Sequence, residues 1–145
     1  MKKILVLVLG LSMVALYVVN SHSATEKDPL APRVPADQIA AAKAMKNPVA
    51  SNPANVAKGK ELFNGKATCF TCHGELGDGN GPAGAALDPL PRNFKNAKFQ
   101  ASKTDGELFW VIKNGSAGTG MISYVPSVIT EQEAWEIITF ERSIK

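Results

Sequence analysis

Histidine and cysteine are scarce in this sequence, and their scarcity excludes most metal and catalytic sites. The chain of 145 residues has two cysteines, Cys69 and Cys72, and two histidines, His22 and His73. His22 lies in an N-terminal segment that we expect to be removed, so a pair of histidine ligands is not available. A zinc site needs about four ligands, or three and a water molecule. The remaining Cys and His residues are too few for it, because adjacent Cys and His side chains rarely reach one tetrahedral ion.

A strong net charge is also absent. The formal charge is +3 at pH 7, and loss of Lys2 and Lys3 with the N-terminal segment lowers it to +1. This value gives no bulk attraction to nucleic acid or to an anionic membrane. The charge is uneven, however, because residues 25–103 have eleven Lys or Arg and seven acidic residues, whereas residues 104–145 have three and six. We expect the basic part to dock acidic protein partners, the alternative being that its charges are only solvated. The lysines concerned are Lys66, Lys95, Lys98 and Lys103.

Residues 1–24 have the layout of a secretory signal peptide. Lys2 and Lys3 are followed by an apolar run, residues 4–19, and then by small residues up to Ala24. The run has 16 residues, which is about 24 Å of helix, whereas a bilayer core is about 30 Å thick. We therefore expect cleavage near Ser23 or Ala24 and export to the periplasm. The alternative is an uncleaved membrane anchor.

Both cysteines and His73 lie in the stretch CFTCHGELGDGNGPAG, residues 69–84. A disulfide within C-x-x-C closes a very small loop and stabilises little. A redox dithiol of the thioredoxin type belongs at a strand-to-helix junction in a βαβ unit, and this sequence shows no alternation of strands and helices. C-x-x-C-H is instead the attachment signature of c-type haem. In this reading Cys69 and Cys72 each form a thioether, and His73 is a ligand of the iron.

The rest of the chain predicts an all-α fold with long loops. Prolines are frequent in residues 25–51, which we expect to be an arm or a tether containing a short helix over residues 36–46. Asn52 caps a helix that ends at Gly65. Capping boxes at Thr104 and Thr130 begin two further helices. The connections between helices, residues 74–103 and 115–129, are long enough to wrap a cofactor.

The second axial position of the iron needs another ligand. Outside the signal segment the methionines are Met45 and Met121. Met121 is favoured, because its glycine-containing loop between two helices can fold over the open face of the haem; a thioether ligand would raise the reduction potential. Met45, a lysine or an open position remain the alternatives.

Four pieces of sequence resemble the class I, monohaem c-type cytochromes of bacteria over residues 52–144. They are GKELFNGKATCFTCHGELGDGNGPAG, LDPLPRNF, GELFWVIKNGSAGTGM and ITEQEAWEIITFERSI, in the order that the family shows. The resemblance implies a small fold wrapped around one covalently bound haem c over residues 52–145. It also implies that the first helix crosses the last near Phe140, that the loop holding Pro82 faces His73, and that Met121 is the sixth ligand. Ile122 replaces the proline that often follows this methionine, and the proline-rich arm has no counterpart in the family.

We expect this protein to carry electrons between redox proteins and to catalyse no reaction of its own. The haem would perform the electron transfer, and the fold would tune its reduction potential. Two alternatives are a tethered subunit of a larger oxidoreductase and a haem-based gas or redox sensor. Candidate donors of hydrogen bonds to the haem propionates are Arg92, Asn93, Trp110 and Tyr124.

Overall fold

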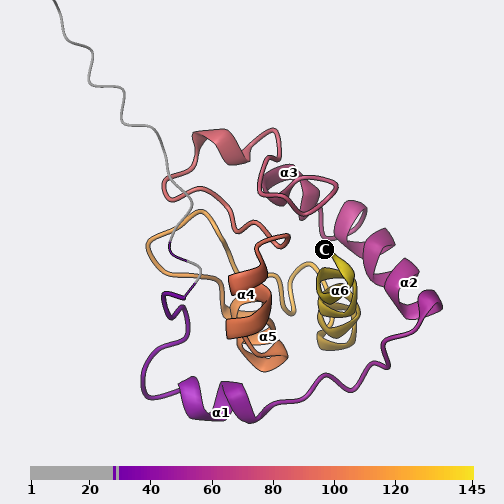
Figure 1. The fold of residues 1–145 in the computed structure, drawn as a ribbon, viewed down its shortest axis with the longest axis horizontal. Helices are drawn as coiled ribbons and strands as arrows, with labels where there is room; N and C mark the ends of the chain where they lie inside the picture. Colours follow the sequence, from indigo (N-terminus) through magenta and orange to yellow (C-terminus); the bar gives the residue numbers. More distant parts are fainter. Residues whose placement is uncertain (1–27, 29) are drawn as a thin grey trace, which may run out of the picture.

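The computed structural model describes residue 28 and residues 30–145, so the expected signal peptide lies outside the described residues. All regular elements of this described part are helices, which confirms the all-α prediction (Figure 1). None of the described helices has the length and apolar character that crossing a membrane requires. In chain order the helices are α1 (Ile39–Ala44), α2 (Pro53–Asn64), α3 (Phe70–His73), the 3-10 helix η1 (Gly84–Ala86), α4 (Ala97–Ser102), α5 (Asp105–Asn114) and α6 (Glu131–Ser143).

The three longest helices begin where the sequence predicts. The Asn52 side chain accepts a hydrogen bond from the backbone N–H of Asn55 at 2.9 Å, and Pro53 occupies the first turn of α2. Thr104 begins α5 and Thr130 begins α6, each with both hydrogen bonds of a capping box. Because these caps satisfy N–H groups that the helix itself leaves unpaired, they fix the start of each helix locally.

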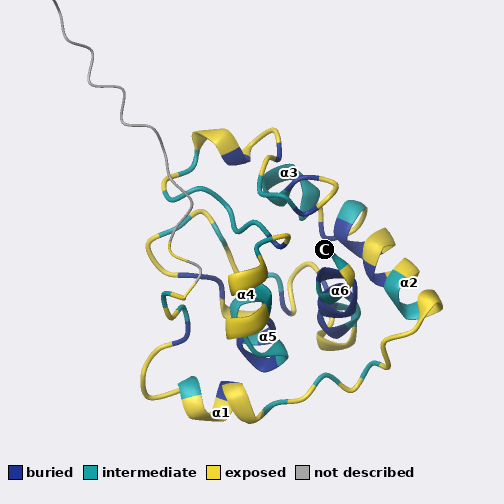
Figure 2. Cartoon of the chain, in the orientation of Figure 1, coloured by how far each residue is buried: buried dark blue, intermediate teal, exposed yellow. Residues whose placement is uncertain are grey.

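The core is centred on the crossing of α2 and α6 (Figure 2). Gly59 lies at the crossing, where a Cβ atom would be only 2.0 Å from the carbonyl oxygen of Glu136. The rings of Phe63 and Phe140 meet edge to face beside it, 5.2 Å apart. This confirms the predicted contact of the first and last helices near Phe140, and glycine is the residue that permits it.

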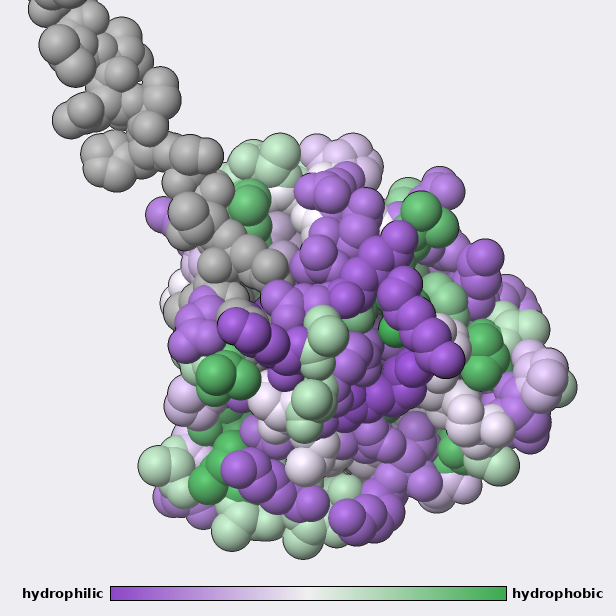
Figure 3. Space-filling view, in the orientation of Figure 1, coloured by the Kyte–Doolittle hydropathy of each residue, from purple (hydrophilic) through white to green (hydrophobic). Residues whose placement is uncertain are grey.

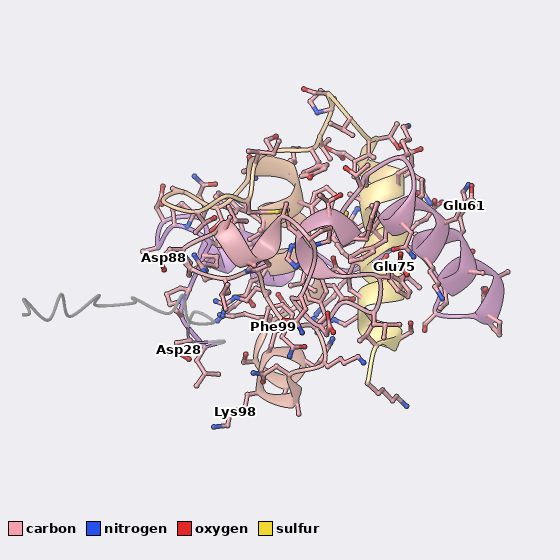
Figure 4. All side chains as sticks on the ribbon, turned by 90° about the horizontal axis from the view of Figure 1, so that it is seen from above. Asp28, Glu61, Glu75, Asp88, Lys98 and Phe99 are labelled. Carbon is pink, nitrogen blue, oxygen red and sulfur yellow. The ribbon has the colours of Figure 1, made fainter. Side chains whose placement is uncertain are left out.

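Helix α4 differs from the sequence-based expectation, which placed a continuous loop over residues 74–103. Asn96 caps α4, its side chain accepting from the backbone N–H groups of Lys98 and Phe99. Phe99 is buried, whereas its neighbour Lys98 points outward (Figure 4). The six-residue helix presents one large apolar residue to the core. This is too little for hydrophobic periodicity to reveal.

The proline-rich segment lies against the domain as an arm, and α1 packs against α5 (Figure 1). Helix α1 is shorter than the predicted range of residues 36–46, because Gln38 provides no side-chain cap and Met45 is extended. Trp110 on α5 donates from Nε1 to the Gln38 side chain at 2.8 Å. Asn47 donates to the Trp135 carbonyl and to the Thr139 hydroxyl on α6.

Candidate functional site

The C-x-x-C-H motif forms one turn of helix. Cys69 is the N-cap of α3, and the His73 N–H donates to the Cys69 carbonyl at 2.9 Å. Residues three and four apart in a helix lie on the same side, so Cys69, Cys72 and His73 face one cavity. The two cysteines are not joined by a disulfide bond. The spacing of the motif is therefore what directs all three side chains to one place.

The glycine-rich loop after α3 returns over the backbone of that helix. The N–H groups of Gly79, Gly81 and Ala83 donate to the carbonyls of His73, Cys72 and Thr71 at 2.7, 3.0 and 2.9 Å. A Cβ atom on Gly81 would lie 2.4 Å from the Thr71 oxygen, so this approach requires glycine. The loop thus satisfies the carbonyls at the end of a helix too short to be stable alone.

The ring of His73 is held in one orientation by three neighbours. Its Nδ1 lies 3.0 Å from the Arg92 carbonyl oxygen, its face stacks on Phe94 at 4.6 Å, and Phe63 lies 6.5 Å away. Burial lowers the pKa of His73, although the Arg92 carbonyl opposes this. A neutral ring that donates from Nδ1 keeps a lone pair on Nε2, as a metal ligand requires.

The loop around Pro82 lies where the family resemblance implies. Its backbone faces that of α3, and the Gly79 N–H donates to the His73 carbonyl, although Pro82 itself is exposed. The carbonyl that meets the His73 ring belongs to Arg92, ten residues further along the chain. Backbone groups of two loop segments therefore meet His73, Gly79 at its carbonyl and Arg92 at its ring.

The two methionines lie in different surroundings. Met121 lines the same cavity as Cys69, Cys72 and His73. Its loop is fixed by two hydrogen bonds, from the Ser116 N–H to the Met121 carbonyl at 2.9 Å and from the Met121 N–H to the Thr119 hydroxyl at 3.1 Å. Met45 is instead packed at the end of α1, beside Gly106 of α5. The geometry therefore favours Met121 over Met45 as a candidate ligand.

The cavity itself has the character of a cofactor site. Its walls are mainly apolar and come from the arm, from α3 to α6 and from the loops between them, including Leu87, Leu108 and Ile129. A haem fits this set of residues: two thiols and an imidazole at one wall, a thioether, and apolar side chains for the ring.

Comparison with known proteins identifies the family. The family model described as cytochrome c oxidase, cbb3-type, subunit III matches residues 54–140. The chain is a c-type cytochrome of this family. Membership implies haem c as the cofactor and electron transfer as the activity. No curated protein matches the chain.

Two solved structures are similar to this chain, and the first of them shares its fold. A chain of the Kuenenia stuttgartiensis complex Kustc0457/Kustc0458, described as a reducing HAO-like protein complex, superposes with a TM-score of 0.59 at 23% identity. The match covers 69% of this cytochrome and 49% of that chain, so the cytochrome corresponds to about half of the larger protein. The KustC0563 c-type cytochrome matches at 26% identity and a TM-score of 0.45, over 60% of this chain and 96% of its own.

The candidate propionate donors separate into two groups. Arg92 and Tyr124 line the cavity of the cytochrome. The pKa of Tyr124 is raised by burial and by the charges of Cys69 and Cys72, which places Tyr124 near the thiols. Trp110 and Asn93 lie outside the described lining, and the indole N–H of Trp110 is already bonded to Gln38. Arg92 thus remains the strongest of the four candidates.

Two cavity residues were missed from the sequence. Arg33 reaches the cavity from the arm, a contact with no local sequence signal. Glu141 lies four residues after Ile137, on the buried side of α6. An acidic residue at that spacing on an apolar face could have been noticed.

Burial raises the pKa of Glu141 to about 8, with Arg142 opposing the shift and Asp105 adding to it. Burial raises the pKa of the Cys69 thiol, and Glu141 raises it further.

The predicted basic docking region is only partly available. Lys66 forms an ion pair with Glu133 of α6 at 2.8 Å, and Lys103 donates to the carbonyls of Leu30 and Ala31. Lys95 and Lys98 are exposed. The face seen in Figure 3 is largely hydrophilic, with small separate apolar areas. Docking of an acidic partner stays a prediction. Of the four lysines that we expected to take part, Lys95 and Lys98 are the two exposed ones without such a contact.

Proposed function

We propose that this cytochrome is a periplasmic electron carrier with one haem attached to Cys69 and Cys72 and with His73 and Met121 as its axial ligands. The observation that carries the proposal is the cavity that these four side chains share. Each supplies a different chemistry: two thiols for covalent attachment, an imidazole and a thioether for the iron. When bound, the haem supplies reversible one-electron transfer.

The residues of the motif hold the haem by covalent bonds. Cys69 and Cys72 would each hold the haem through one thioether bond to a former vinyl group. His73 presents Nε2 while its Nδ1–H donates to the Arg92 carbonyl. The stacked ring of Phe94 keeps the imidazole from turning. A ligand held in this way has the same orientation in both oxidation states.

The Met121 loop would supply the second side-chain ligand of the iron. Its hydrogen bonds to Ser116 and Thr119 keep the loop in place over the cavity. A thioether ligand favours the reduced iron and so raises the reduction potential. An iron held by both His73 and Met121 would have no coordination site for a substrate or a gas. We therefore propose a carrier rather than an enzyme or a gas sensor.

The sequence of the N-terminal segment bears on where the protein is located and which partners it meets. The signal-peptide pattern of residues 1–24 supports export to the periplasm, with other redox proteins as donor and acceptor. A second candidate function is a subunit of a larger oxidoreductase. The family description, which names an oxidase subunit, favours this alternative.

Two matched methionine variants test the ligation. We expect Met121→Ala to keep the haem attached, to lose the weak sulfur-to-iron absorption band at the red end of the spectrum, and to have a lower reduction potential. Met45→Ala should match the wild type in both measurements, because Met45 packs at the α1–α5 contact. The reverse result would identify Met45 as the ligand. No change in either variant would mean a different sixth ligand or an open position.

A further inference from the structure

The N-terminal arm, residues 28 and 30–51, reaches the cavity as well as the outer surface. Val34 is 5% exposed, and both Arg33 and Val34 line the cavity. The Arg33 guanidinium donates from Nη1 to the Ser116 hydroxyl at 3.2 Å, which joins the arm to the loop that carries Met121. The arm is therefore one wall of the site.

The arm is held in this position at several points. Helix α1 lies so close to α5 that a Cβ atom on Gly106 would be 1.9 Å from the Ala42 carbonyl oxygen. Lys103 donates to the carbonyls of Leu30 and Ala31 at 3.0 and 3.1 Å. Arg33 thus enters the cavity on a backbone that is tied to the domain on both sides of it.

Three cations from separate segments line the cavity: Arg33 from the arm, Arg92 from the loop before α4, and Lys103 from the C-terminal end of α4. Burial lowers the pKa of Arg33. Burial also lowers the pKa of Lys103; the charge of Glu107 opposes this shift, and the charge of Arg92 adds to it. Cations that line one cavity attract an anion to it.

Two carboxyl groups also line the cavity. Glu107 accepts the hydrogen bond from the Thr104 N–H in the capping box of α5, and its charge raises the pKa of Lys103. Glu141 lies near Cys69, at the thiol end, and burial raises its pKa to about 8. The three cations therefore outnumber the two carboxyl groups of the lining.

We propose that the arm completes the haem site and that Arg33, together with Arg92 and Lys103, faces the haem carboxylates. The inference rests on the proposed function, since the two propionates are the anionic groups of a haem and extend from the edge opposite its vinyl groups. Oxidation adds one positive charge to the iron. A cation held in a partly buried site beside the haem disfavours that charge and raises the reduction potential. Arg33 is then a tuning residue supplied by a segment outside the family core.

Charge-changing variants at Arg33 test this role in the full-length holoprotein. Arg33→Gln removes the charge and keeps a hydrogen-bond donor, so we expect a lower midpoint potential at fixed pH and low salt. Arg33→Lys keeps the charge and should retain most of the wild-type potential. Lys46→Gln is the matched control, because Lys46 is an exposed cation of the same arm outside the cavity lining. It should leave the potential unchanged.

A fourth variant separates charge from anchoring. Ser116→Ala removes the hydrogen-bond partner of Arg33 but no charge, and its potential should shift less than that of Arg33→Gln. Equal shifts in these two variants, or a potential of Arg33→Gln equal to that of Lys46→Gln, would overturn the inference. Wild-type protein without covalently attached haem would overturn the proposed function as well. Attached haem with an unshifted Arg33→Gln potential would overturn only the role of Arg33.

Discussion

Replacing Gly59 by alanine tests the helix crossing on which the cavity depends. A Cβ atom at this position would lie 2.0 Å from the Glu136 carbonyl oxygen and 2.9 Å from the Phe140 Cβ. Real Cβ contacts essentially never fall below 3.0 Å, so α2 and α6 would have to separate by about 1 Å at the crossing. The obstructing oxygen belongs to the backbone of α6 and cannot rotate away.

The cost follows from what the crossing buries. Phe63 on α2 and Ile137 on α6 are fully buried there. Forcing extra volume into a packed core costs about 1–3 kcal/mol, and we take the upper end, about 3 kcal/mol, because a helix must move. Alanine offsets about 1 kcal/mol of this through its higher helix propensity. We expect Gly59→Ala to lower the free energy of unfolding by about 2 kcal/mol.

The assay is guanidinium unfolding of the holoprotein followed by far-ultraviolet circular dichroism. Ala57→Gly on the exposed side of α2 is the control, since it changes helix propensity alone and should cost about 1 kcal/mol. If propensity were the whole effect at Gly59, alanine would stabilise the protein. A variant as stable as the wild type, or more stable, would refute the close crossing of α2 and α6.

Two further predictions concern the buried carboxyl and the arm. The pKa of Glu141 is raised from 4.5 to about 8 in the folded protein, so stability is highest below the unfolded pKa and falls as pH rises toward the folded one. Between these two pKa values the wild type should lose up to about 1.4 kcal/mol of unfolding free energy per pH unit, and Glu141→Gln should not show this loss. Chemical unfolding of both proteins at several pH values measures it. An equal dependence of the unfolding free energy on pH in both proteins would contradict the prediction. Gly106→Ala places a Cβ atom 1.9 Å from the Ala42 carbonyl oxygen, so α1 should leave α5 and limited proteolysis should cut the arm faster, whereas an unchanged cleavage rate would contradict the packing.

Local signals made the main helices predictable. Asn52 with Pro53, and the capping boxes that begin at Thr104 and Thr130, fix helix starts through contacts within three residues. The cofactor motif is equally local, because one helical turn brings Cys69 and His73 to the same side. Such features depend on neighbouring residues alone, so a sequence is enough to reveal them.

Contacts between distant segments were not predictable in the same way. Arg33 meets Ser116 across 83 positions of sequence. The carbonyl bonded to the His73 ring belongs to Arg92, 19 positions away, because the loop before α4 folds back over α3. The side of the arm that enters the cavity also depends on the packing of α1 against α5. Neither hydrophobic periodicity nor a helix cap in the sequence indicates these contacts between distant segments.

The central claim is that Cys69 and Cys72 hold one haem covalently, and intact mass of periplasmically expressed protein tests it most directly. The account predicts a mass that exceeds that of the signal-cleaved polypeptide by one haem, with colour that resists acid-acetone extraction. Replacing both cysteines by serine should abolish the added mass. An extractable pigment, or a mass equal to that of the polypeptide alone, would contradict the account.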